Sequence, residues 1–165
     1  MSEAVRKSKS KPLGSSHSPA FDAVVELLGG DALVQAPLDT AMDTHALLKR
    51  GLTGRSVQHL LASLTGTHAA DDVARAMGVS VRTFQRIKSA PEKHVSLELS
   101  GRAWMFAEVL AKATQVLGSQ AEAEAWLDRP AMALEQAKPL ELMETLTGTE
   151  MVRTLLTRIE YGVYT

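Results

Sequence analysis

A single glycine between two amphipathic segments constrains the fold of this chain more than any other feature of the sequence. In ARAMGVSVRTFQRIKS, residues 74–89, one apolar helical pattern ends at Gly78 and another begins after Ser80. Glycine adopts the positive φ that a sharp turn requires, and Ala74 is small enough for two helices to approach closely. The pattern predicts a helix-turn-helix whose second helix is N-capped by Ser80. The apolar residues that would form its shared core are Val73, Met77, Val79, Phe84 and Ile87.

The second helix presents a polar, basic face once its apolar residues turn inward. Arg82, Gln85 and Arg86 lie on that face at spacings of three and four residues. Arginine can bind guanine and glutamine can bind adenine in the major groove, whereas lysine and hydroxyl groups suit phosphates. A merely solvated surface, or a helix-turn-helix that serves only as a scaffold, is the alternative. The residues expected to contact operator DNA are Ser80, Arg82, Thr83, Gln85, Arg86 and Lys88.

Helical spacing of apolar residues recurs along the rest of the chain, and no segment shows the alternation of a strand. The expected fold class is therefore all-α. Glycine or proline marks the ends of several helices. The segments predicted to be helical are 19–28, 44–50, 54–64, 70–77, 81–89, 97–117, 121–127, 140–146 and 150–161.

Composition and charge exclude several classes of protein. The chain has 165 residues, 45% of them hydrophobic, and a net charge of −1, so any binding to nucleic acid must be local. It contains no cysteine, which removes disulfides and thiolate chemistry and fits the reducing cytoplasm, where we expect the protein. No apolar run is long enough to span a bilayer, so no membrane partner is expected.

No motif of a known enzyme class is present either. The sequence lacks HExxH, GxSxG and a glycine-rich phosphate loop. His59 adjoins Leu60 in a helical pattern and reads as an ordinary surface or core residue. Asp71 and Asp72 fit the first turn of a helix, where the helix dipole favours acids, better than a metal site. We expect no catalytic residue, metal ligand or cofactor.

Charge is distributed unevenly along the chain. Residues 82–94 hold four basic residues against one acid, a net charge of +3, and residues 119–165 hold eight acids against four bases, a net charge of −4. Residues 1–18 are basic and rich in serine, and we expect a flexible tail there, either solvated or touching DNA phosphates. The acidic end suits a basic partner or plain solvent.

The C-terminal third carries the order WL…P…L…PLELM…T…G…V…L…RIEYGVY, between residues 126 and 164. This order of residues resembles the toxin-binding domain of Xre/MbcA/ParS-type antitoxins. Upstream, GLTGRSV (residues 51–57) and VSVRTFQR (residues 79–86) resemble the Xre-like region of that family, so the likeness covers about residues 50–165. Gln136 and Lys138 stand where the family often has a glycine-rich approach to a proline. The C-terminal residues that carry the likeness are Trp126, Leu127, Pro130, Leu134, Pro139, Leu140, Leu142, Thr145, Gly148, Val152, Leu155, Arg158, Ile159, Glu160, Gly162, Val163 and Tyr164.

The resemblance implies an antitoxin of a type II toxin–antitoxin system. Its partner would be a RES-domain toxin that consumes NAD or transfers ADP-ribose from it, and the C-terminus would plug the toxin's active site. The antitoxin would also bind its own promoter as an autorepressor. A helix-turn-helix transcriptional regulator without a toxin partner is the alternative. The residues expected to bind the toxin are Arg158, Glu160, Tyr161, Gly162, Val163, Tyr164 and Thr165.

The same resemblance, with the helical pattern, divides the chain into four parts. Residues 1–18 would be the flexible tail, and residues 19–65 an N-terminal helical region. Residues 66–117 would be an Xre-like helix-turn-helix region, and residues 118–165 a helical toxin-binding domain. The short helices of residues 19–65 look too small to bury themselves alone, so we expect a homodimer within a larger toxin–antitoxin complex.

Overall fold

The computed structural model describes residues 18–36, 38–66 and 69–163 of the chain. Within these ranges the fold is all-α, which confirms the predicted fold class. The described residues contain no strand beyond an isolated antiparallel bridge between Thr53 and His94. Apart from Ser18, the tail expected over residues 1–18 lies outside the described residues.

Three short helices come first: α1 (Pro19–Leu27), α2 (Gly30–Val34) and α3 (Ala41–Arg50). The sequence pattern does not predict α2, and it places the start of α3 too late, at residue 44. The true start is set by a reciprocal capping box, in which Thr40 N donates to Asp43 Oδ2 at 2.8 Å and Asp43 N donates to Thr40 Oγ1 at 3.2 Å.

The predicted helix-turn-helix lies between α4 (Gly54–Ala62) and the long central helix. Its two helices are α5 (Ala69–Ala76) and α6 (Val81–Ser89), and the bounds of α6 are those predicted. Gly78 has a φ of 72°, the left-handed conformation that the turn was expected to need. The expected inward residues Val73, Met77, Val79 and Ile87 are buried, and Phe84 is half-buried.

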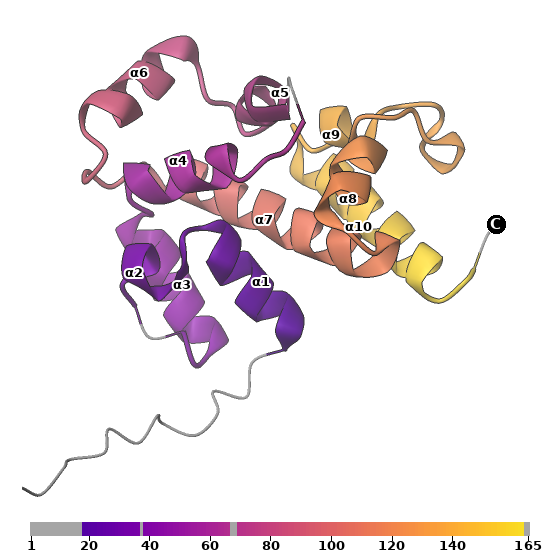
Figure 1. Ribbon diagram of the computed structural model, residues 1–165, viewed down its shortest axis with the longest axis horizontal. Coiled ribbons are helices and arrows are strands. Elements are labelled where there is room, and N and C mark those ends of the chain that lie inside the picture. The colour runs from indigo at the N-terminus through magenta and orange to yellow at the C-terminus, as the bar shows by residue number, and fades with distance from the viewer. Residues whose placement is uncertain (1–17, 37, 67–68, 164–165) are drawn as a thin grey trace, which may run out of the picture.

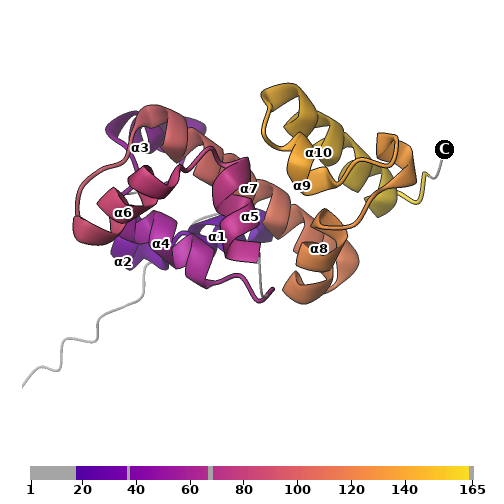
Figure 2. The same cartoon turned by 90° about the horizontal axis from the view of Figure 1, so that it is seen from above.

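The central helix α7 (Leu97–Leu117) has 21 residues, as predicted, and is about 31 Å long at 1.5 Å per residue. It runs through the middle of the molecule (Figure 1), and α1, α3 and α4 pack against it. The C-terminal helices α8 and α10 also pack on α7. Figures 1 and 2 both show α6 and α10 at opposite ends of the molecule.

The C-terminal third forms α8 (Gln120–Leu127), the 3-10 helix η1 (Met132–Leu134), α9 (Pro139–Leu142) and α10 (Leu146–Glu160). The pattern does not predict η1, and its helices over 140–146 and 150–161 are wrong in their bounds. Thr145 Oγ1 accepts a hydrogen bond from Gly148 N at 3.0 Å, which starts α10 before the glycine.

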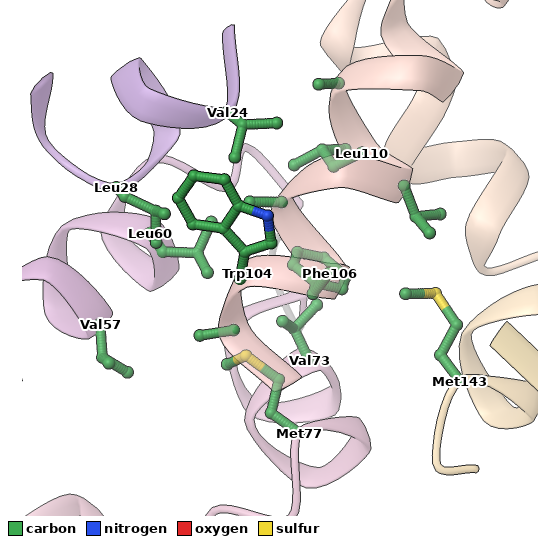
Figure 3. Close-up of a cluster of buried hydrophobic side chains, with 14 of the residues drawn as sticks. Val24, Leu28, Val57, Leu60, Val73, Met77, Trp104, Phe106, Leu110 and Met143 are labelled. Atoms are coloured by element: carbon green, nitrogen blue, oxygen red, sulfur yellow. The ribbon is translucent and has the colours of Figure 1, made fainter. Parts of the chain in front are cut away.

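The buried side chains of these helices form one continuous cluster. Figure 3 shows its centre, where Trp104 of α7 lies close to Val24 of α1 and to Leu28, the C-cap residue of that helix. Because α1 is buried against α7 of its own chain, the burial argument for a dimer through residues 19–65 loses its premise. The homodimer and the four domain boundaries therefore stay predictions.

Candidate functional site

The basic face of the helix-turn-helix is built on α6. Ser80 caps the helix, because Thr83 N donates to Ser80 Oγ at 3.1 Å, and the Ser80 and Thr83 hydroxyls lie 3.0 Å apart. Ile87 is buried beneath the helix. Lys88 Nζ lies 4.5 Å from the centroid of the half-buried Phe84 ring. Two of the expected phosphate contacts, Ser80 and Thr83, therefore hold the start of α6 together, and Lys88 is held over Phe84 by a cation–π contact.

The outer face of α6 is open. Arg82, Gln85 and Arg86 are exposed, and neither arginine forms an ion pair with an acid in the described part of the chain. Val81, at the first position of α6, is 79% exposed beside them and is absent from the predicted contact set. The arrangement leaves cationic and hydrogen-bonding groups along one side of a helix, as binding in a major groove requires.

Helix α4 supports α6 on the side away from its exposed face. Gln58 Nε2 donates to the carbonyl of Ile87 at 2.8 Å, and Gly54 N donates to the carbonyl of Lys93 at 2.9 Å. A Cβ on Gly54 would lie 3.1 Å from the carbonyl oxygen of Pro91 and 3.2 Å from Ile87, so glycine permits this close approach. The expected DNA-binding face is thus carried on a rigid support rather than on a loop.

A second candidate site lies at the C-terminal end of α10. Gly162 N donates to the carbonyl of Ile159 at 3.1 Å, Val163 N donates to that of Arg158 at 2.9 Å, and Gly162 has a φ of 66°. These paired bonds and the left-handed glycine form a Schellman motif, which ends the helix and turns the chain away from its axis. The side chain of Tyr161 is 75% exposed and that of Val163 is 52% exposed.

The predicted toxin-binding residues differ in their exposure and in whether they form ion pairs within the chain. Arg158 is exposed and forms no ion pair with the described residues. Glu160, in contrast, pairs with Lys112 of α7, and both side chains are less than one third exposed. Tyr164 and Thr165 lie outside the described residues. The structure therefore brings Arg158, Tyr161, Gly162 and Val163 together at the helix end, and it holds Glu160 against α7.

A groove runs between η1 and α10 and ends near the same helix terminus. Its volume is about 360 Å³. Sequence reasoning does not identify it, because η1 is not predicted and Met151 does not enter the predicted apolar face of α10. The residues that line it are Ala133, Leu134, Thr147, Glu150, Met151, Thr154, Leu155 and Arg158.

The turn before α9 has an unusual backbone conformation. Glu135 and Gln136 have φ values of 55° and 65°, the left-handed region that glycine adopts without strain, at the place where the glycine-rich pattern is missing. Lys138 Nζ donates to Asp128 Oδ1 at 3.0 Å, and this hydrogen bond raises the pKa of Lys138 above its ordinary value.

The C-terminal part of the chain matches a known family. Residues 112–162 match the family model described as the antitoxin Xre/MbcA/ParS C-terminal toxin-binding domain. A similar curated protein, Antitoxin Xre of Photorhabdus laumondii subsp. laumondii, is 27% identical over 128 residues, which are 77% of this chain and 84% of that protein. The chain is thus similar to Xre/MbcA/ParS antitoxins, through its C-terminal part and through this relative.

The matched residues run from the last turns of α7 to Gly162. They include the whole groove, the Glu160–Lys112 pair and Tyr161, and they exclude α6 and its basic face. The family match therefore concerns this C-terminal part alone and does not bear on DNA binding by α6.

Two further findings concern membranes and metals. No helix in the described part of the chain is long and apolar enough to cross a membrane. Among the same residues, no group of three or more His, Cys, Asp or Glu side chains could hold a metal ion. His59 Nδ1 lies 3.2 Å from the carbonyl oxygen of Leu27, and Asp72 pairs with Arg75 at 3.2 Å, so both have structural partners.

Helix α8 is hydrogen-bonded to the loop after α4. Glu124 accepts hydrogen bonds from Thr65 N at 2.8 Å, from Thr65 Oγ1 at 2.9 Å and from Gly66 N at 3.0 Å. Gln120 Nε2 donates to Glu124 at 2.7 Å and to the carbonyl of Ser63 at 2.8 Å. These contacts attach the loop after α4, which leads into the helix-turn-helix, to the first helix that lies wholly within the matched residues.

Proposed function

We propose that this antitoxin neutralises a RES-domain toxin, one that hydrolyses NAD or transfers ADP-ribose, by plugging the toxin's active site with the segment after α10. The observation that carries the proposal is the exposed Tyr161 and Val163 on a turn at the end of α10, in and next to the residues that match a toxin-binding domain. The RES identity of the toxin rests on the resemblance of the C-terminal sequence.

Physical reasons favour this segment as an inhibitor. Gly162 ends the helix, and a segment that is not helical is narrower than a helix and can enter a cleft that a helix cannot. Tyrosine buries a large area with few rotatable bonds to freeze, so Tyr161 and Tyr164 can contribute affinity at low entropic cost. The free guanidinium of Arg158 can pair with an anionic group at the mouth of a site that binds NAD.

Truncation after Glu160 tests the plug. The truncated antitoxin keeps α10 and the Glu160–Lys112 pair, so we expect it to fold and still to co-purify with the protein encoded in the adjacent reading frame. It should fail to restore growth when that protein is expressed, and cellular NAD should fall if the toxin consumes it. Full protection by the truncated chain would overturn the plug.

We also propose that the antitoxin represses its own promoter through α6, as part of a homodimer within a higher-order complex in the cytoplasm. The open basic face, supported by α4, is the observation in favour. A helix-turn-helix regulator without a toxin partner is the alternative, and the open face of α6 suits it equally. Truncation after Glu160 separates the two, because it should leave a plain regulator unaffected.

A further inference from the structure

We propose that the groove between η1 and α10 is the surface on which the toxin docks, and that its occupant is an apolar segment of the toxin flanked by basic residues. The inference deepens the proposed antitoxin function and rests on it. It separates two tasks: the groove supplies most of the affinity for the toxin, and the segment after α10 supplies the inhibition. None of the residues predicted from the sequence to bind the toxin, except Arg158, lines this groove.

The groove has an apolar floor and an open mouth. Leu134 of η1 is buried and forms part of the floor, and Leu155 of α10 is half-buried. Met151 lies one helical turn before Leu155 on the same face and is 45% exposed. A volume of about 360 Å³ accommodates one or two large side chains, so the groove suits an inserted anchor from a partner rather than a whole helix.

Exposed apolar residues are concentrated around this groove. Of the eight large hydrophobic residues that are exposed in the described part of the chain, five lie between residues 132 and 163. Met132 on η1 is 81% exposed and Leu146 at the start of α10 is 72% exposed. Such a concentration marks a contact surface, and methionine is flexible enough to fit the shape of a partner.

Charge indicates what surrounds the apolar anchor of the partner. Glu150 lines the groove, and Glu135 and Glu144 are exposed on the segments next to it. Residues 119–165 carry eight acids and four bases, a net charge of −4. Of these bases, Arg153 lies 3.9 Å from Glu150, and Arg158 lines the groove itself. A partner with complementary charge therefore presents basic residues around an apolar side chain.

The position of the groove identifies the occupant as the toxin. All of its lining residues lie within residues 112–162, which match the toxin-binding domain. Its last lining residue, Arg158, also accepts the hydrogen bond of the turn that carries Val163. A toxin seated in the groove would meet the segment after α10 without leaving this surface, so docking and plugging belong to one continuous interface.

A competition experiment with matched methionine substitutions tests the proposal. The tagged protein of the adjacent reading frame is co-expressed with wild-type antitoxin and one untagged variant, and the ratio of the two antitoxins retained is measured by intact mass. Met151→Lys places a charge in the groove, and Met42→Lys places the same charge at an exposed methionine of α3, far from it. We expect Met151→Lys to be depleted by at least about tenfold and Met42→Lys by less than about twofold.

The antitoxin truncated after Glu160 completes the comparison. We expect it to be retained nearly as well as the wild type while failing to protect cells. Circular dichroism and thermal unfolding of each free variant check that the fold is intact, and Met151→Ala, which only removes volume, should show a smaller depletion in the same direction. Equal retention of Met151→Lys and wild type would overturn the groove alone. Failure of the wild type itself to be retained would overturn the toxin partnership, and the groove with it.

Discussion

Glu135 and Gln136 show how a single backbone angle can cost stability. Both have left-handed φ values, 55° and 65°, which side chains with a Cβ adopt at a cost of about 1–2 kcal/mol. Neither side chain is buried, so neither contributes to the core at this turn. The turn keeps its shape because Ala131 N donates to the carbonyl of Ala137 at 3.1 Å and Gln136 N donates to that of Ala131 at 3.0 Å.

Gln136→Gly should therefore stabilise the antitoxin. Relief of the strain outweighs the greater freedom of glycine in the unfolded chain, and we expect a gain of about 0.5–1 kcal/mol in the free energy of unfolding. Gln115→Gly, in an exposed position of α7, is the matched control and should lose about 1 kcal/mol. Urea unfolding of the three proteins measures both. Destabilisation by Gln136→Gly would show that the side chain contributes something that the backbone angle does not reveal.

Gly148 illustrates a requirement for close approach rather than for an unusual angle. A Cβ there would lie 1.9 Å from the carbonyl oxygen of Leu142, so Gly148→Ala must push α9 and α10 apart. We expect a loss of about 3 kcal/mol or more in the free energy of unfolding. Gly101→Ala is the control, because nothing lies within 4 Å of its added Cβ, and it should stabilise α7 by about 1 kcal/mol. Thermal unfolding measures both variants. Melting temperatures that shift in the same direction would contradict this explanation.

At the scale of helices, sequence reasoning succeeds where the chain itself marks both ends. The bounds of α6 are predicted because Ser80 caps its start and Pro91 follows its end, and the end of α7 is predicted because Gly118 follows it. In the structure, Ser96 caps the start of α7. The bounds of α9 and α10 are missed because Gly148 reads as a helix stop, whereas here it is demanded by the neighbouring helix. Only the packed structure reveals that.

The candidate sites also divide into features that the local sequence indicates and features that only the packed structure reveals. The open face of α6 follows from helical spacing alone. The Glu160–Lys112 pair depends on a contact between residues far apart in the chain, and no local pattern indicates it. The groove depends on how η1 packs beside α10. A charged residue near the end of a helix looks free in a sequence, and Glu160 is instead held by α7. For the groove, the one available signal is Met151, which places an apolar residue outside the buried face formed by Val152 and Leu156.

The face of α6 leads to a prediction about DNA. Arg82→Ala combined with Arg86→Ala should weaken binding to a fragment of the antitoxin's own promoter by about 10–100-fold, because two cations and their base contacts are lost. The dependence of binding on salt should fall by about two counterions. Toxin binding should be unchanged. Fluorescence anisotropy at several salt concentrations measures these effects.

The matched control removes the same charge elsewhere. Lys49→Ala combined with Arg129→Ala takes one cation from α3 and one from the turn after α8, and both residues are exposed. This control should bind the promoter fragment within about threefold of the wild type, because distant exposed charges are largely screened. Equal effects of the two double variants would mean that α6 is not the recognition helix.

The contacts of Glu124 predict how firmly the loop after α4 is held. Glu124→Ala leaves Thr65 N and Gly66 N without their acceptor, so we expect a loss of about 1–3 kcal/mol in the free energy of unfolding and faster hydrogen exchange at residues 65 and 66. Glu122→Ala, on the exposed side of the same helix, should change the free energy of unfolding by less than about 1 kcal/mol. Unchanged exchange at these amides in Glu124→Ala would show that the loop is held by other contacts.

At the scale of the whole molecule, α7 lies between the two proposed binding surfaces, and the helices that carry them share one hydrophobic core. Helices α6 and α10 lie at opposite ends of the molecule (Figures 1 and 2), so the contacts proposed for DNA and for the toxin use separate surfaces. Contacts between α8 and the loop after α4, and between α5 and α9, connect the two ends. The arrangement suits an autorepressor that remains bound to its toxin.

The central claim is that the segment after α10 inhibits the toxin, and the rate of NAD consumption tests it most directly. Complexes of the adjacent-frame protein with the full antitoxin, and with the antitoxin truncated after Glu160, would be purified at equal stoichiometry and incubated with NAD, with a protein acceptor present or absent. We predict that the full complex is silent and that the truncated complex consumes NAD at close to the rate of the free toxin. A truncated complex that stays silent, although the free toxin consumes NAD, would contradict the account.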